Sequence, residues 1–121
     1  MDSRKLGQIG EEIAQNYLKK HHYSILTTHW QKRSGEIDII AFDNTSKETV
    51  FVEVKTTSSL EFGFPEEKVN TTKIRKILKT ALFYINEHQN VKRWRIDVIS
   101  ILINTSSKKA HIKHYKNISF D

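Results

Sequence analysis

The sequence predicts a mixed α/β domain whose elements follow the order helix, three strands, helix, strand. Two segments carry apolar residues at helical spacing, and the segments between and after them are rich in β-branched and aromatic residues. The connection between the third and fourth strands contains the second helix, so it is long enough for a right-handed crossover that makes these strands parallel. We therefore expect a mixed central sheet flanked by helices.

The two helices are expected at residues 3 to 20 and from Pro65 to about Asn86. Pro65 suits a helix start, and the acidic Glu66 and Glu67 suit the positive end of the helix dipole. The buried stripes that the spacing predicts are Leu6, Ile9, Ile13, Ala14 and Tyr17 in the first helix, and Ile74, Ile77, Leu78, Ala81 and Ile85 in the second.

The strands are expected where β-branched and aromatic residues gather between turn formers. A cluster of turn residues at 43–48 separates the second strand from the third, so these two should form an antiparallel hairpin. The predicted strands are Tyr23–Trp30, Glu36–Phe42, Thr49–Lys55 and the strongly apolar Trp94–Ile103, with Ala110–Tyr115 as a short edge strand.

The length of 121 residues, with 37% hydrophobic and 28% charged residues, fits one globular domain over residues 1–121. The absence of cysteine excludes disulfides, thiolate zinc sites and a cysteine nucleophile. We see neither a secretory signal nor a run near the roughly 20 apolar residues of a membrane span. The expected location is the cytoplasm.

The formal charge of +6 is unevenly placed along the chain. Residues 1–62 hold 8 Lys and Arg against 9 Asp and Glu, whereas residues 63–121 hold 12 against 5. A basic surface attracts polyanions, of which nucleic acid is the commonest in a cytoplasm. Charge alone equally allows a basic protein whose surface is only solvated.

The predicted hairpin brings two carboxylates together. Alternation along a strand places Glu53 and Lys55 on one face, and symmetric closure about the turn pairs Phe42 with Thr49. Counting back from that pair sets Asp38 opposite Glu53, and Glu36 opposite Lys55. Like charges in such a pair repel, which predicts a compensating cation.

Mg²⁺ or Mn²⁺ would offset this repulsion, because hard cations bind carboxylate and backbone carbonyl oxygens. The expected metal ligands are Asp38, Glu53 and the carbonyl of Val54, which lies between Glu53 and Lys55. Lys55 would then act on a water molecule or on the charge that develops at a phosphate. The alternative is a solvated Glu-X-Lys ion pair of small energetic effect.

The second half of the chain supplies the expected nucleic-acid-binding residues, which are Lys73, Arg75, Lys76, Lys79, Lys92 and Arg93. Lys76, Lys79 and Phe83 recur on the face opposite the apolar stripe, where Phe83 would stack on a base or pack in a dimer. The six histidines show no metal-binding pattern and are interpreted as surface or packing residues.

Several stretches resemble the YraN-like proteins, which belong to the PD-(D/E)XK nuclease superfamily and are similar to archaeal Holliday junction resolvases. The resemblance covers about Lys5 to Phe120. The matching stretches are Gly10–Ala14, Gly35–Ala41, Val50–Lys55, Phe62–Gly63, the basic segment from Lys73, and Arg95–Val98.

The resemblance implies a restriction-endonuclease-like αβββαβ core. It makes Asp38 and Glu53 metal ligands, Lys55 the catalytic lysine and Glu11 a further acidic contributor, although a solvated helix carboxylate is the alternative for Glu11. Family members often carry arginine where this chain has Thr57. Resolvase-like relatives also act on two-fold substrates, which implies a homodimer.

The sequence thus favours a metal-dependent endonuclease that hydrolyses phosphodiester bonds in DNA, including branched or structured DNA. One alternative is a non-catalytic nucleic-acid-binding protein with a nuclease-like fold. Another is a scaffold protein that presents its basic face to an acidic protein partner.

Overall fold

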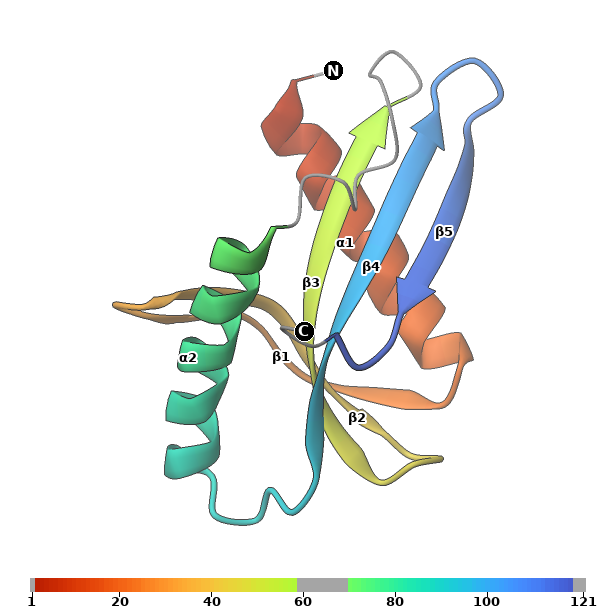
Figure 1. Cartoon of the computed structure of the whole chain (residues 1–121). Coiled ribbons are helices and arrows are strands. Elements are labelled where there is room, and N and C mark those ends of the chain that lie inside the picture. Colours follow the sequence, from red (N-terminus) through yellow and green to blue (C-terminus); the bar gives the residue numbers. More distant parts are fainter. Residues whose placement is uncertain (1, 59–69, 119–121) are drawn as a thin grey trace.

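The computed structural model describes residues 2–58 and 70–118 (Figure 1). The elements, in chain order, are α1 (Ser3–Lys20), β1 (Tyr23–Lys32), β2 (Gly35–Asp43), β3 (Glu48–Ser58), α2 (Thr71–Glu87), β4 (Trp94–Asn104) and β5 (Lys109–Tyr115). This order confirms the predicted helix, three strands, helix and strand, followed by the edge strand. Within the described residues, no helix is long and apolar enough to span a membrane.

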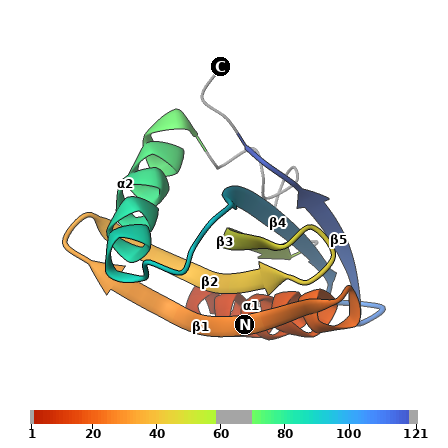
Figure 2. The same ribbon diagram turned by 90° about the horizontal axis from the view of Figure 1, so that it is seen from below.

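The five strands form one mixed sheet in the order β1-β2-β3-β4-β5. Neighbours are antiparallel except for β3 and β4, which run parallel as the crossover argument predicts. Helix α1 covers one face of the sheet and α2 lies on the other, which Figure 2 shows from below. The mixed sheet flanked by helices is therefore confirmed.

Helix α1 begins at an Asp2 cap, whose carboxylate accepts a hydrogen bond from the Lys5 amide at 2.8 Å. The buried positions are Leu6, Gly10, Ala14 and Leu18. The predicted stripe was therefore correct at Leu6 and Ala14, while Ile9, Ile13 and Tyr17 are half-buried at its edge. The centre of the stripe runs through Gly10 because a residue without a side chain lets the helix approach β3.

Helix α2 begins at Thr71, where the Asn70 side chain accepts a hydrogen bond from the Lys73 amide at 3.0 Å. The start expected near Pro65, with Glu66 and Glu67, lies outside the described residues. The expected acidic first turn is wrong for the described helix, which has no acidic residue there.

The buried face of α2 is only partly apolar. Ile74, Ile77 and Ala81 are buried as predicted, and Leu78 and Ile85 are half-buried against the same cluster. Thr80 and Tyr84 are also buried, which the apolar spacing missed. Burial of Thr80 is tolerated because its hydroxyl donates to the Lys76 carbonyl at 2.9 Å and bonds the Ser34 hydroxyl at 2.6 Å.

We predict that Gly10→Ala lowers the free energy of unfolding by about 1–3 kcal/mol, because a Cβ atom there would lie 1.8 Å from Thr56 Oγ1. Gly7→Ala is the matched control, since nothing lies within 4 Å of a Cβ at that position. Alanine in a helix interior should make Gly7→Ala more stable by roughly 0.5–1 kcal/mol. Urea unfolding of both variants checks the pair, and equal effects would contradict the close approach of α1 to β3.

Candidate active site

The hairpin of β2 and β3 brings Asp38 and Glu53 together. Its pairing runs from Asp43–Glu48 through Phe42–Thr49 to Ile39–Val52, so the predicted register is confirmed. One step beyond the last pair, the Asp38 carboxylate accepts the Val54 amide at 2.8 Å. Asp38 thus replaces a backbone partner at the point where the described pairing of the two strands ends. The predicted pair of Glu36 with Lys55 is not among the pairs that the described β2 and β3 form; on its other side, Glu36 pairs with Gln31 of β1.

Glu53 is the most buried carboxylate of this site, with 4% of its surface exposed. Burial, a hydrogen bond to Asp38 and the negative charge of Asp38 raise the pKa of Glu53 to about 8, against the opposing positive charges of Lys73 and Lys55. The two carboxyl groups therefore hold a proton between them at neutral pH when no other cation is bound.

Two lysines accompany the carboxylates. The Lys73 ammonium lies 3.3 Å from Glu53 Oε2, and Lys55 is half-buried two residues beyond Glu53 on the same strand. Lys73 comes from the first turn of α2, so the crossover helix contributes to the site. Sequence reasoning assigned Lys73 to nucleic acid and did not foresee its ion pair with Glu53, because no pattern along the chain connects the start of α2 with β3.

Three buried side-chain oxygens lack a hydrogen-bond partner within the described part of the chain, and all lie on β3 or β4. They are Glu53 Oε2, Thr57 Oγ1 and Ser100 Oγ. Ser100 pairs with Lys55 in the parallel register, between Ile99 and Ile101, which pack towards α1. These three oxygens consequently face the α2 side, where Glu53 also lies. Glu53 Oε2 has the Lys73 ammonium as its charge partner, and the two hydroxyls have no partner among the described residues, so this face favours a polar or cationic ligand.

These residues fit a divalent cation of the Mg²⁺ type. Asp38, Glu53 and the Val54 carbonyl would hold it, since Mg²⁺ commonly uses one or two protein carboxylates and completes its shell with water and phosphate. No group of three or more His, Cys, Asp or Glu side chains suited to a metal occurs among the described residues. The metal ligands that this site offers are therefore the carboxylates of Asp38 and Glu53 and the backbone carbonyl of Val54.

Glu11 approaches the same region from α1. Burial and the negative charge of Asp38 raise the pKa of Glu11, and His29 partly offsets them. His29 Nε2 lies 2.8 Å from Glu11, and His29 Nδ1 lies 2.8 Å from Glu36. The hydrogen bond to Glu36 is the largest cause that raises the pKa of His29. His29 thus holds two carboxylates beside Asp38.

The interpretation of all histidines as surface or packing residues missed this bridge. His29 adopts a left-handed backbone conformation, with φ of 51°, inside β1. This local departure from regular strand geometry turns a side chain in a way that alternation does not predict. The sequence signal that could have indicated the contact is Glu36, a carboxylate on the strand that pairs with β1.

A family model described as "Uncharacterised protein family UPF0102" matches residues 10–101. A UPF0102 protein of Persephonella marina is 43% identical over 116 residues, covering 95% of this chain and 92% of that protein. One from Caldicellulosiruptor bescii is 42% identical over 119 residues, covering 97% and 98%. The chain belongs to the UPF0102 family.

Membership of UPF0102 confirms the YraN-like resemblance. The matched residues 10–101 include Gly10, Glu11, both carboxylates of the hairpin, and Arg95 with Asp97. The structure explains the residues of two matching stretches. Gly10 lets α1 pack closely against β3, and the β2–β3 hairpin places Asp38 beside Glu53.

The expected nucleic-acid-binding residues of this UPF0102 chain do not form one cluster. Lys73 reaches the acidic pair, whereas Arg75, Lys76 and Lys79 are exposed along α2. Lys92 and Arg93 are exposed beyond the other end of α2, in the segment before β4. These basic side chains are therefore spread along α2, from the acidic pair at its start to the segment beyond its C-terminal end.

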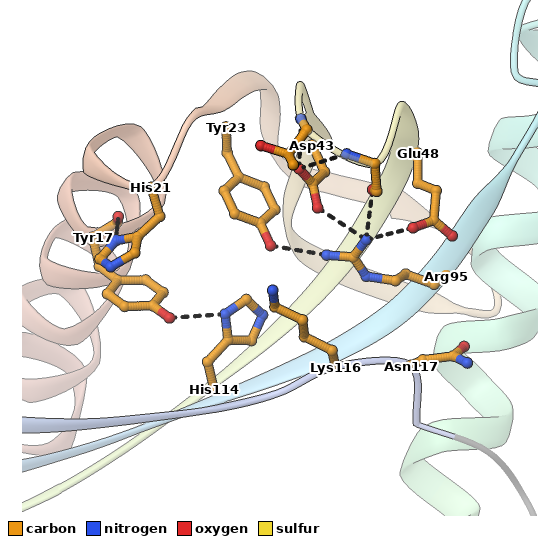
Figure 3. A pocket seen from close by; sticks show the side chains of 11 residues that line it. Tyr17, His21, Tyr23, Asp43, Glu48, Arg95, His114, Lys116 and Asn117 are labelled. Atoms are coloured by element: carbon orange, nitrogen blue, oxygen red, sulfur yellow. Dashed lines mark hydrogen bonds and ion pairs between the residues drawn. The ribbon is translucent and has the colours of Figure 1, made fainter.

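A second polar cluster of this UPF0102 chain surrounds the buried Arg95 on β4 (Figure 3). Its guanidinium donates to Glu48 at 2.7 Å, to the Tyr23 hydroxyl at 2.8 Å and to Asp97 at 3.0 Å. It also donates to the Ser46 hydroxyl at 3.0 Å and to Asp43 at 3.1 Å. Sequence reasoning recognised Arg95 and Asp97 only as a matching stretch, without this role.

Asp97 connects this cluster to β5. Burial opposes its ionisation, but hydrogen bonds from His114, Arg95 and the Asn117 amide lower the pKa of Asp97. His114 also bonds the Tyr17 hydroxyl of α1 at 3.0 Å, and the cluster borders a pocket of about 490 Å³. Because each charge has a buried partner, we interpret this cluster as a structural tie between α1, the hairpin, β4 and β5.

We predict that Asp97→Asn lowers the free energy of unfolding by about 1–3 kcal/mol, since it removes the fully buried one of the three carboxylates that pair with Arg95, while Asp43 and Glu48 remain. Glu12→Gln removes an equal charge from an exposed position of α1 and should change stability by less than about 0.5 kcal/mol. Urea unfolding measures both. A cost below about 1 kcal/mol for Asp97→Asn would show that water replaces the ion pair.

A second prediction concerns pH. Because the pKa of Glu53 is raised on folding, the folded protein keeps a proton that the unfolded chain releases above about pH 4.5. The metal-free protein should therefore lose stability as the pH rises from about 5 through 8. Glu53→Gln should flatten this slope and be the more stable protein at pH 8. Unfolding in chelator at pH 5, 6.5 and 8 checks this, and parallel curves for the two proteins would refute it.

Proposed function

We propose that this chain is a PD-(D/E)XK-type endonuclease that uses Mg²⁺ or Mn²⁺ to hydrolyse phosphodiester bonds in DNA, with branched or structured DNA among its substrates. The observation that carries the proposal is the convergence of Asp38 with the buried Glu53 beside Lys55 and Lys73, whose ammonium lies 3.3 Å from Glu53 Oε2. Two carboxylates held this close together destabilise the fold unless a cation compensates their charge, so the pair is typical of a site that binds a cation.

When bound, the cation supplies Lewis acidity to a phosphoryl oxygen and lowers the pKa of a water molecule. The chain's own groups act around it. The Lys55 ammonium would stabilise negative charge as it develops on the attacked phosphate. Lys73, which pairs with Glu53 in this structure, would hold a neighbouring phosphate. His29 would keep Glu11 oriented towards Asp38.

The alternative function is a nucleic-acid-binding protein without cleavage. The observation in its favour is the Lys73–Glu53 ion pair, which together with the shared proton compensates the carboxylates without a metal. Under this alternative the acidic pair only anchors α2 to β3, while Arg75, Lys76 and Lys79 contact the phosphate backbone.

We predict that Asp38→Asn and Lys55→Ala each slow cleavage by on the order of 10²- to 10³-fold while DNA affinity persists. Asn is chosen because its carbonyl oxygen still accepts the Val54 amide, which Asp38 holds at 2.8 Å. Asp38→Asn should also weaken Mn²⁺ binding, whereas Lys55→Ala should not. The measurements are cleavage of linear, single-stranded and four-way-junction DNA with Mg²⁺, Mn²⁺ or chelator, and calorimetry with Mn²⁺.

Lys19→Ala is the control, because Lys19 is exposed at the end of α1, away from the hairpin site. It should cleave as the wild type does. Wild-type protein that cuts none of the three substrates above the chelator background would favour the binding protein over the enzyme. Sedimentation of the protein with and without junction DNA tests the accompanying proposal that two copies act on a two-fold substrate.

A further inference from the structure

A pocket of about 670 Å³ lies at the end of α2 that is remote from Glu53. Its lining residues come from the C-terminal turn of α2, the segment 88–93 that leads to β4, parts of β1, β2 and β3, and the turn between β2 and β3. Because α2 has 17 residues, its two ends are about 25 Å apart, so this pocket is separate from the acidic pair.

The charged side chains that line this pocket are all positive. Lys47, Lys92 and Arg93 line it, and no Asp or Glu is among the described residues of its lining. The pocket beside Arg95 is different, because Asp43 and Glu48 line it and bond the guanidinium. The pocket at the end of α2 is therefore suited to an anionic group.

Its walls are apolar and aromatic. Leu26 and Phe42 come from β1 and β2, and Tyr84 and Val91 come from the opposite wall. Leu26 is 48% exposed, which leaves its side chain available to a ligand. A ligand that fills the pocket would bury apolar surface here while its charge contacts the lysines and arginine.

Tyr84 and His88 form a flat stack, with ring centroids 3.8 Å apart and planes inclined by 11°. His88 Nδ1 lies 2.9 Å from the Tyr84 carbonyl, which only accepts hydrogen bonds, so Nδ1 carries the proton of that bond. In the neutral ring, Nε2 is then an acceptor. The half-buried His88 ring, backed by the buried Tyr84, offers this wall an aromatic surface and an acceptor for a ring amino group.

We propose that this pocket binds a nucleotide, with the base against the wall of Leu26, Tyr84 and His88 and the phosphate at Lys47, Lys92 and Arg93. Base stacking on aromatic side chains and phosphate contacts from cationic ones are the interactions that nucleotides make with proteins. The volume is within the range of small-molecule sites. The nucleotide is either a free nucleoside monophosphate or the phosphorylated end of a DNA strand.

The test is an NMR titration of ¹⁵N-labelled protein, in chelator, with 2′-deoxyadenosine 5′-monophosphate. The expected result is saturable shifts at Leu26, His88 and Arg93, with much weaker effects from deoxyadenosine or inorganic phosphate alone, because each probe lacks half of the contacts. Shifts confined to Lys73–Lys79 of α2, or equal binding of inorganic phosphate, would overturn the proposal.

Two variants locate the site. Lys92→Ala with Arg93→Ala should weaken the nucleotide roughly tenfold or more, the ratio that about 1.4 kcal/mol produces. Lys19→Ala with Lys20→Ala removes the same charge from exposed positions at the end of α1 and should bind as the wild type does. Equal affinity of the two double variants would overturn the proposal.

Leu26→Asp is the second variant, and it places a carboxylate where the ligand would lie. Because Leu26 is half-exposed, the fold should persist, which thermal unfolding verifies. Binding should be lost. Retained binding in a folded Leu26→Asp protein would place the nucleotide elsewhere.

The two sources of the nucleotide are separated with tetranucleotides that carry or lack a 5′-phosphate. Binding of the phosphorylated strand at the same residues indicates a strand end, and binding of the mononucleotide alone indicates a free nucleotide. Absence of both binding events overturns the proposal. Because these measurements need neither metal nor cleavage, Asp38→Asn should bind as the wild type does, and a failure of the nuclease proposal leaves this test intact.

Discussion

The antiparallel register of β2 with β3 places the acidic side chains of the sheet in pairs. A single alignment, in which Phe42 faces Thr49, sets Asp43 against Glu48 at the turn and brings Asp38 beside Glu53 at the far end. A slip of one residue would move these side chains to opposite faces of the sheet. The hairpin therefore determines the positions of two acidic pairs at once.

The two pairs are compensated differently. At the turn, the Arg95 guanidinium contacts Asp43 at 3.1 Å and Glu48 at 2.7 Å, and its remaining donors reach Asp97 and Tyr23. At the far end the pair relies on a shared proton, on the ion pair with Lys73 and on the charge of Lys55. A proton and a flexible lysine are easily displaced, whereas a buried arginine with several acceptors is not. The contrast separates a pair that holds the fold from one that is available for chemistry.

Sequence reasoning succeeded where a short-range rule determines the outcome. Strand alternation and a symmetric turn were enough for the register and for the meeting of Asp38 with Glu53, and the length of the crossover was enough for the parallel β3–β4 pair. The contacts that it missed join residues far apart in the chain. Lys73 with Glu53, and Arg95 with Asp43, depend on how a helix and a strand dock after the crossover, which no local pattern records. His29 was missed for a different reason, because its left-handed backbone breaks the alternation.

The parallel pairing of β3 with β4 has a consequence for the order in which the chain assembles. The β1–β2–β3 meander closes through short turns, but the pair Thr49–Trp94 joins residues separated by the whole of α2 and its connections. Closing that longer loop costs more chain entropy, so it should follow the meander. Arg95 comes with β4 and Lys73 with the crossover helix. Both acidic pairs therefore form before Arg95 and Lys73 arrive, and Lys55 of β3, protons or dissolved cations are the counter-charges available at that stage.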